Sequence, residues 1–190
     1  MKRFFLLMLC CIFSFSVYAQ EHQTFMGIPI DGSLTSFASQ LEAKGFEKLS
    51  VGDSSVTLEG QFSGSKRVVI VYSTPITKIV YQVAVVLRES TSWSSLKSTY
   101  RDFKSILITK YGQPTGKEEF ITPYYEGDGY EMTALRNEKC NYTQIFYTEH
   151  GSIMLWISSV LDGSVLINYY DKLNDALCDA EESSLKYNDL

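Results

Sequence analysis

The sequence lacks two features that would assign it to large functional classes. It has no cluster of basic residues, and its 17 Lys and Arg are outnumbered by 22 Asp and Glu, a formal net charge of −5. Because an acidic surface repels phosphate backbones, nucleic acid is not expected as a partner. A membrane-spanning helix needs about 20 apolar residues, and no run after residue 20 is that long. We therefore expect no transmembrane segment in the mature chain.

Short motifs of catalytic and metal sites are also missing. There is no Gly-x-Ser-x-Gly nucleophile elbow, phosphate-binding loop or EF-hand loop. The only two histidines are His22, in a polar lead-in at residues 20–24 that is predicted to be mobile, and His150, in a predicted turn. A catalytic histidine needs a nucleophile and an orienting carboxylate, and the sequence places neither beside these two. We predict a non-catalytic protein without cofactor or metal, and a hydrolase is the less favoured alternative.

Cysteine is scarce. Two of the four cysteines, Cys10 and Cys11, lie in the N-terminal segment, which leaves Cys140 and Cys178 in the rest of the chain. An even pair of cysteines in an oxidising compartment favours a disulfide. We predict a Cys140–Cys178 bridge, with two buried free thiols as the alternative.

The N-terminal segment has the pattern of a secretory signal peptide. Lys2 and Arg3 precede an apolar run at 4–13, and small residues stand at Val17 and Ala19. Positive start, short apolar core and small residues before the cleavage point occur in this order in signal peptides. The sequence predicts a signal peptide at 1–19 and export to the periplasm or the extracellular space. An uncleaved anchor is the alternative.

The remaining residues, 20–190, are predicted to form a single α+β domain. Apolar residues recur at helical spacing over 33–44 and 92–111, and Gly45 and Gly112 stand where the two helices should end. A C-terminal helix is predicted over 171–186. Its expected apolar face consists of Leu173, Ala176, Leu177 and Ala180.

Apolar or alternating runs with short connections predict antiparallel strands between the helices. These runs lie at 56–62, 67–72, 79–87, 141–148, 152–160 and 165–170. A helix followed by three or more strands therefore occurs twice, over 25–89 and 90–170. We predict an antiparallel sheet with helices packed on one face, built from two tandem helix-plus-meander repeats and the C-terminal helix. An unduplicated sheet with helices on one face is the alternative.

One stretch resembles a known group of sequences. The motif is Phe25-Met26-Gly27-Ile28-Pro29-Ile30-Asp31-Gly32-Ser33-Leu34-x-x-Phe37 with Leu41-x-x-Lys44-Gly45-Phe46. It resembles the opening of uncharacterised exported proteins of anaerobic gut bacteria, and it covers mostly the first half of the mature chain. The order of elements is similar to that of the β-lactamase-inhibitor protein and of small outer-membrane assembly lipoproteins. This likeness implies an interaction module and carries over no site residues, because fold does not fix function.

The best candidate for a contact surface is the segment 123–131. It combines Tyr124, Tyr125 and Tyr130 with glycines and with the acids Glu126 and Asp128. Tyrosine supplies contact area at low entropic cost, and glycine lets a loop conform to a partner. The alternatives are tyrosines packed on the sheet edge, or a weak calcium site at the carboxylates.

These observations predict an exported, non-catalytic binding module whose partner is a protein or another envelope component. The alternative is a carrier of a small apolar ligand between the sheet and the helices, which would require an apolar pocket of about 300 Å³ or more. The oligomeric state is left open by the sequence.

Overall fold

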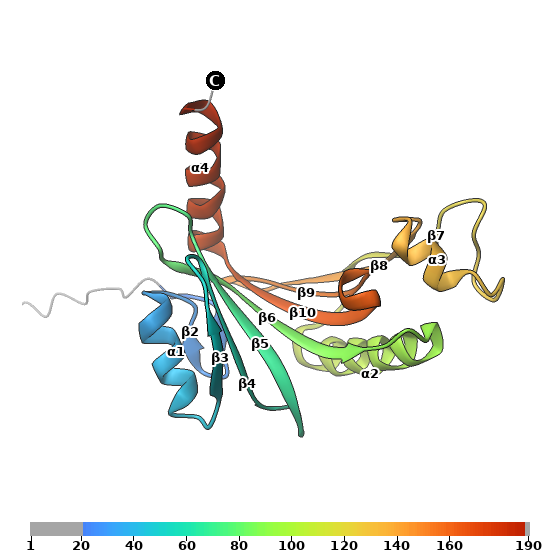
Figure 1. Cartoon of the computed structure of the whole chain (residues 1–190), viewed down its shortest axis with the longest axis horizontal. Helices are drawn as coiled ribbons and strands as arrows, with labels where there is room; N and C mark the ends of the chain where they lie inside the picture. Colours follow the sequence, from blue (N-terminus) through green and yellow to red (C-terminus); the bar gives the residue numbers. More distant parts are fainter. Residues whose placement is uncertain (1–20, 189–190) are drawn as a thin grey trace, which may run out of the picture.

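The computed structural model describes residues 21–188, and its main feature is an eight-stranded antiparallel sheet (Figure 1). In spatial order the strands are β3 (Glu47–Val51), β4 (Ser55–Phe62), β5 (Ser65–Ser73), β6 (Val80–Glu89), β10 (Ser164–Asp171), β9 (Gly151–Ser158), β8 (Cys140–Tyr147) and β7 (Thr115–Phe120). The other elements of this part are a small hairpin, β1 (Thr24–Phe25) and β2 (Ile28–Pro29), the helices α1 (Leu34–Glu42), α2 (Trp93–Tyr111), α3 (Glu131–Arg136) and α4 (Lys172–Asn188), and a 3₁₀ turn at Val160–Asp162.

The sheet consists of two four-stranded meanders that join at its centre. Strands β3 to β6 form one meander and β7 to β10 the other, and β6 pairs with β10. Helix α1 precedes the first meander and α2 precedes the second. The predicted fold class, an antiparallel α+β sheet with helices on one side and a C-terminal helix, is confirmed. That the two halves are repeats of one another stays a prediction.

Helices α1 and α2 form where the apolar spacing predicted them. Ser33 caps α1 by accepting a hydrogen bond from the Ser36 amide at 3.2 Å. Gly45 and Gly112 follow the two helices with φ of +90° and +86°, a conformation that favours glycine. The buried side chains of the two helices are Phe37, Ala38 and Leu41 in α1, and Trp93, Leu96, Tyr100 and Leu107 in α2.

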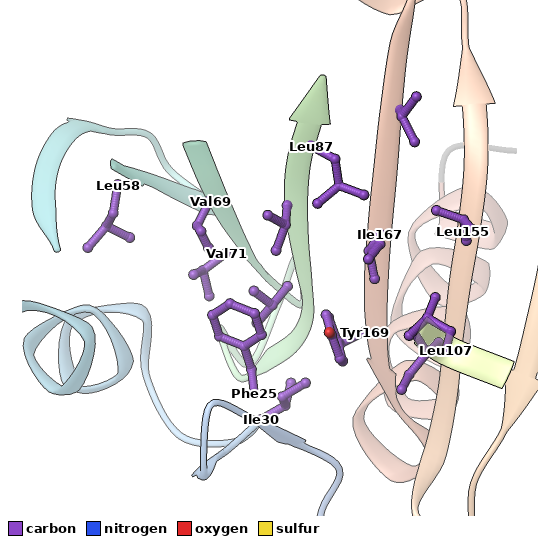
Figure 2. Packing of buried hydrophobic residues seen from close by; sticks show 14 of the residues in the cluster. Phe25, Ile30, Leu58, Val69, Val71, Leu87, Leu107, Leu155, Ile167 and Tyr169 are labelled. Carbon is purple, nitrogen blue, oxygen red and sulfur yellow. The ribbon is translucent and has the colours of Figure 1, made fainter. Parts of the chain in front are cut away.

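The hydrophobic core lies between these helices and one face of the sheet. Val69, Val85, Ile167 and Leu155 are register partners on neighbouring strands, so their side chains share a face, and all four are buried. Figure 2 shows Val69, Ile167 and Leu155 in this cluster. Burial of one such side chain stabilises the fold by about 1.5–3 kcal/mol. This row fixes which face of every central strand is turned toward α1 and α2.

The N-terminal lead-in is part of the fold. Residues 21–24 were predicted to be mobile, but Gln23 is buried and its amide donates to Asp171 Oδ2 at 2.8 Å. Thr148 Oγ1 also donates to Gln23 Oε1 at 2.8 Å. The predicted signal peptide, 1–19, lies outside the described residues.

Helix α4 is placed by polar contacts, and its predicted apolar face is wrong. Leu173 is 37% exposed, whereas Asn174, Cys178 and Glu181 are buried. The Asn174 amide donates to the carbonyls of Ile30 at 2.9 Å and Val80 at 3.0 Å. The helix projects from the end of β10, close to the loop between β5 and β6 (Figure 1). No helix among residues 21–188 is long and apolar enough to span a membrane.

The predicted disulfide is absent, because Cys140 and Cys178 are both free. Cys140 begins β8 and pairs with Phe120 of β7, near the edge of the sheet. Cys178 lies in α4, which contacts β6, β10 and β9 at the end of the sheet that holds Tyr147 and Tyr170, whereas Cys140 lies at the opposite end, beside α3. A disulfide needs the two Cα atoms within about 4.4–6.8 Å, and the placement of these elements does not provide it.

Candidate binding surfaces

The predicted contact loop follows β7 and is held in shape by its own acidic residues. The Asp128 carboxylate accepts hydrogen bonds from the amides of Tyr125 at 3.0 Å and Tyr130 at 2.7 Å. The Gly127 amide donates to Glu131 Oε1 at 2.8 Å. These carboxylates therefore order the loop, and residues 21–188 contain no group of three or more His, Cys, Asp or Glu side chains that could hold a metal ion.

The same loop presents only two of its three tyrosines to solvent. Tyr125 is 66% exposed and Tyr130 is 63% exposed. The Tyr124 hydroxyl accepts a hydrogen bond from Asn137 Nδ2 at 3.0 Å. Glu126 forms an ion pair with Lys97 and accepts a hydrogen bond from the Tyr142 hydroxyl at 3.2 Å. Of the five predicted binding residues, Tyr124, Glu126 and Asp128 hold the loop, while Tyr125 and Tyr130 are free to meet a partner.

Both histidines lie beside carboxylates. His22 Nδ1 lies 3.1 Å from Asp171 Oδ2, and its Nε2 lies 3.7 Å from Asp31 Oδ2. The Nδ1 contact is close enough for an ion pair but is not aligned as a hydrogen bond. Both ring nitrogens thus face carboxylates, which leaves neither turned toward a nucleophile. His150 Nε2 lies 3.0 Å from Glu21 Oε2, whose side chain is largely exposed.

The strand register reveals a second surface, which we call the uncovered face. It is the face of the sheet opposite α1 and α2, and two neighbouring rows of side chains cross it from β5 to β8. The first row is Ile70, Ala84, Asn168, Met154 and Ile145. The second row is Val68, Val86, Leu166, Trp156 and Thr143. Eight of these ten side chains are apolar.

The exposure of this face differs along its rows. Ala84, Val86 and Leu166 at the centre are buried by their neighbours, whereas Ile70 and Trp156 keep part of their surface in contact with solvent. On the outer strands the first row continues as Thr57 and Thr115, which are polar. An apolar centre inside a polar margin is the usual composition of a protein-binding patch.

Hollows lie at two ends of the uncovered face. One of about 330 Å³ lies between α4 and the side chains of Tyr147, Ser152 and Tyr170. The α4 side of this hollow carries Asp175 and Asp179. Burial raises the pKa of Asp175, and the carboxylates of Asp179 and Asp171 raise it further. This end of the face therefore carries two carboxyl groups, together with the side chain of Lys172.

The hollow at the other end lies beside α3 and has a volume of about 460 Å³. Its lining includes Leu135 and Glu138 from the α3 region, and Thr143 and Trp156 from the sheet. The contact loop leads into α3, so the exposed tyrosines stand near this end (Figure 1). The uncovered face is thus bounded by α4 at one end and by the α3 region at the other.

A separate cleft lies on the helix side of the sheet. It has a volume of about 660 Å³ and separates α2 from the N-terminal hairpin and the β4–β5 turn. Ile167 and Tyr169 of β10 lie within it, together with Leu107 of α2. The volume exceeds the threshold that the sequence analysis set for a small-ligand carrier.

Comparisons of the whole chain found no relative: no family model, no curated protein and no solved structure matches it. The resemblance of residues 25–46 to exported proteins of gut bacteria therefore stays a prediction. Function has to be inferred from the geometry of the surfaces described above.

Proposed function

We propose that the chain is an exported, non-catalytic binding module that engages a protein of the cell envelope through the uncovered face. The observation that carries this proposal is the pair of apolar rows across β5, β6, β10, β9 and β8. Helices α1 and α2 pack on the opposite face, and six of the ten side chains in these rows are half-buried and keep part of their surface in contact with solvent: Val68, Ile70, Thr143, Ile145, Met154 and Trp156. A contiguous apolar patch that stays in contact with solvent is a marker of interaction sites on soluble proteins.

The surface has the properties that favour tight contact. Met154 in the first row and Trp156 in the second row both belong to β9 and supply polarizable apolar area. Tryptophan is enriched among the residues that dominate binding energy. The rows belong to hydrogen-bonded strands, so little conformational entropy is lost when a partner docks. Tyr125 and Tyr130 add amphipathic contacts beside one end of the face.

Export is part of the same proposal. It is supported by the charge, apolar core and small-residue order of residues 1–19. An envelope location would place the uncovered face where other exported proteins are available to bind. The intact mass of the protein isolated from its own cells tests this, because processing would remove the residues before Gln20.

The decisive experiment compares two double variants of the same row. Ile70→Glu with Met154→Glu places charges in the apolar centre, and Thr57→Glu with Thr115→Glu places the same residue type at its polar margin. Cross-linked complexes are captured from envelope fractions, and circular dichroism verifies that both variants are folded. We expect the centre variant to lose at least nine-tenths of the protein partner that the wild type captures, and the margin variant to retain it.

Two results would overturn the proposal. One is equal capture by the wild type and the folded centre variant. The other is a wild-type protein that elutes as a dimer and a centre variant that elutes as a monomer, because the face would then serve self-association.

A second candidate function is favoured by a different observation. The helix-side cleft of about 660 Å³ is large enough for a small-molecule ligand. It lies on the other face of the sheet, so the two functions do not compete for the same residues.

A further inference from the structure

The helix-side cleft lies on the face of the sheet that carries α1 and α2. It opens over the centre of the sheet, between the N-terminal hairpin and the end of α2. The N-terminal hairpin and the β4–β5 turn line one side through Met26, Gly27 and Phe62. The last two turns of α2 line the other side. Strand β10 contributes Ile167 and Tyr169, as Figure 2 shows with Leu107 and Phe25 nearby.

Most of the cleft is apolar. Leu107 and Ile167 are buried, and Phe103 is only half-buried although it belongs to the apolar stripe of α2. Ile106, which precedes Leu107 in α2, is 53% exposed. The end of α2 therefore presents apolar side chains that α1 and the hairpin do not cover.

The wall opposite α2 is built from packed aromatic rings. The rings of Phe25 and Phe62 stack with centroids 5.7 Å apart, and the rings of Phe25 and Tyr169 meet edge to face at 5.2 Å. Phe25 is buried and fixes both neighbours from behind. A wall of this kind keeps its shape when the cleft is empty, which lowers the cost of binding.

The apolar lining is broken by one cation, Lys110, by the hydroxyl groups of Tyr111 and Tyr169, and by the uncharged polar residues Gln23, Thr24, Ser63 and Thr148. Lys110 Nζ lies 5.0 Å from the ring centroid of Tyr111, and among the ion pairs of residues 21–188 none involves Lys110. Tyr111 and Tyr169 also line the cleft, and the hydrogen bonds of this part of the chain use neither hydroxyl. Burial raises the pKa of Tyr169, and Tyr111 raises it further. The Tyr169 hydroxyl is therefore available to a ligand as a hydrogen-bond donor.

This arrangement selects the charge of the ligand. A full positive charge beside hydroxyl donors attracts an anion, and the carboxylate is the anion that most often terminates an apolar chain. The C-terminal end of α2 carries a partial negative charge of about half a unit, which is smaller than the charge of Lys110. The net effect at the mouth of the cleft favours a carboxylate over a cationic or neutral head.

We propose that the helix-side cleft binds a long-chain carboxylate of the fatty-acid type. The acyl chain would lie over Leu107, Ile167 and Phe103, and the carboxylate would meet Lys110 and the hydroxyl groups of Tyr111 and Tyr169. The volume lies within the range of small-molecule sites. This site is independent of the protein-binding face.

The test is calorimetric titration of the purified, folded protein with dodecanoate below its micellar concentration. Dodecanol and a cationic dodecyl amphiphile of the same chain length serve as competing probes. Lys110→Met removes the charge and keeps the apolar stem, Ile106→Ser removes apolar area at the mouth, and Lys44→Met is the matched control on the exposed end of α1.

We expect Lys110→Met to weaken dodecanoate binding at least tenfold while dodecanol binding changes less than twofold. Ile106→Ser should weaken both probes, and Lys44→Met should change neither. The proposal is overturned if the wild type does not bind dodecanoate, if it binds the cationic amphiphile as tightly, or if Lys110→Met binds dodecanoate as the wild type does. The Ile70→Glu and Met154→Glu variant should keep dodecanoate binding, which separates this site from the uncovered face.

Discussion

Glu181 offers the sharpest test of how α4 is held to the domain. Its side chain is buried, with 7% of the residue exposed, and it accepts hydrogen bonds from the Ile76 amide at 2.6 Å and the Thr77 hydroxyl at 2.5 Å. The Thr77 amide lies 3.2 Å from both carboxylate oxygens. Burial acts to raise the pKa of Glu181, but the hydrogen bonds from Thr77 and Ile76 outweigh it and the pKa is lowered.

The change Glu181→Gln keeps the shape of this side chain, but only one of its two terminal atoms can then accept a hydrogen bond. One carboxylate oxygen becomes an NH₂ group, which then faces either the Ile76 amide or the Thr77 hydroxyl and leaves that donor without an acceptor. A hydrogen bond to a charged group contributes about 1.5–3 kcal/mol. We therefore expect the free energy of unfolding to fall by about 2 kcal/mol, which for a domain of this size lowers Tm by about 4–8 °C.

The pH dependence gives a second signature. Because the folded-state pKa is lower than the ordinary value of 4.5, the carboxylate contributes its full stability above about pH 4.5. That contribution is lost as the pH falls through the folded-state pKa. The stability gap between the wild type and Glu181→Gln should be constant from about pH 7 to 5 and should close below about pH 4.5.

Urea unfolding at several pH values, followed by circular dichroism, measures both effects. Glu182→Gln is the matched control, since its side chain is 52% exposed on the same helix, and it should change stability by less than about 0.5 kcal/mol. A Glu181→Gln variant as stable as the wild type at pH 7, or a gap that persists unchanged at pH 3, would refute this account of α4.

Two further predictions concern packing and the thiols. Gly60→Ala should lower the free energy of unfolding by about 1–3 kcal/mol, because the new Cβ would lie 2.5 Å from the ring of Phe46. Thermal unfolding measures this loss of stability, and an unchanged Tm would mean that the Phe46 ring moves aside without cost. Cys140 and Cys178 should both be alkylated by iodoacetamide in unfolded, unreduced protein, with no mass change on reduction. Burial, with a contribution from Glu131, raises the pKa of Cys140 to about 12. This half-buried thiol should therefore react slowly at pH 8 in the folded protein, and a rapid native reaction would contradict the raised pKa.

Local pattern was sufficient for α1, α2 and most strands. In α2 the spacing of Trp93, Leu96, Tyr100 and Leu107 placed the buried side correctly, because the helix packs on the sheet through a continuous apolar stripe. The stop at Gly112 also followed from local backbone preference. These features depend on residues close together in the sequence, which a periodicity analysis can detect.

Helix α4 could not be predicted in the same way. Its orientation is set by Asn174 and Glu181, whose partners Ile30, Val80, Ile76 and Thr77 are about 90 to 145 residues away in the chain. Nothing in the helix itself distinguishes these two polar residues from solvated ones. The apolar residues of α4 were therefore assigned to the buried side, and the polar ones occupy it.

The candidate surfaces were only partly predictable. The composition of the contact loop pointed to Tyr125 and Tyr130, but it could not show that Tyr124 is turned toward Asn137. The sequence analysis did not predict the uncovered face. The apolar runs of β5 and β6 are continuous, and a continuous apolar run indicates a strand that is buried on both faces of its sheet. Only the register of neighbouring strands shows that one set of these side chains lines up across five strands.

The contact between Gln23 and Asp171 has a consequence for the order in which the domain folds. It joins residues 148 positions apart, and the central pairing of β6 with β10 also links distant parts of the chain. Contacts of such long sequence separation form late, because the entropy of closing a large loop has to be overcome first. The N-terminal hairpin therefore reaches its final position only when β10 is present, so a nascent chain can pair β3 to β6 locally while its first residues still wait for their anchor.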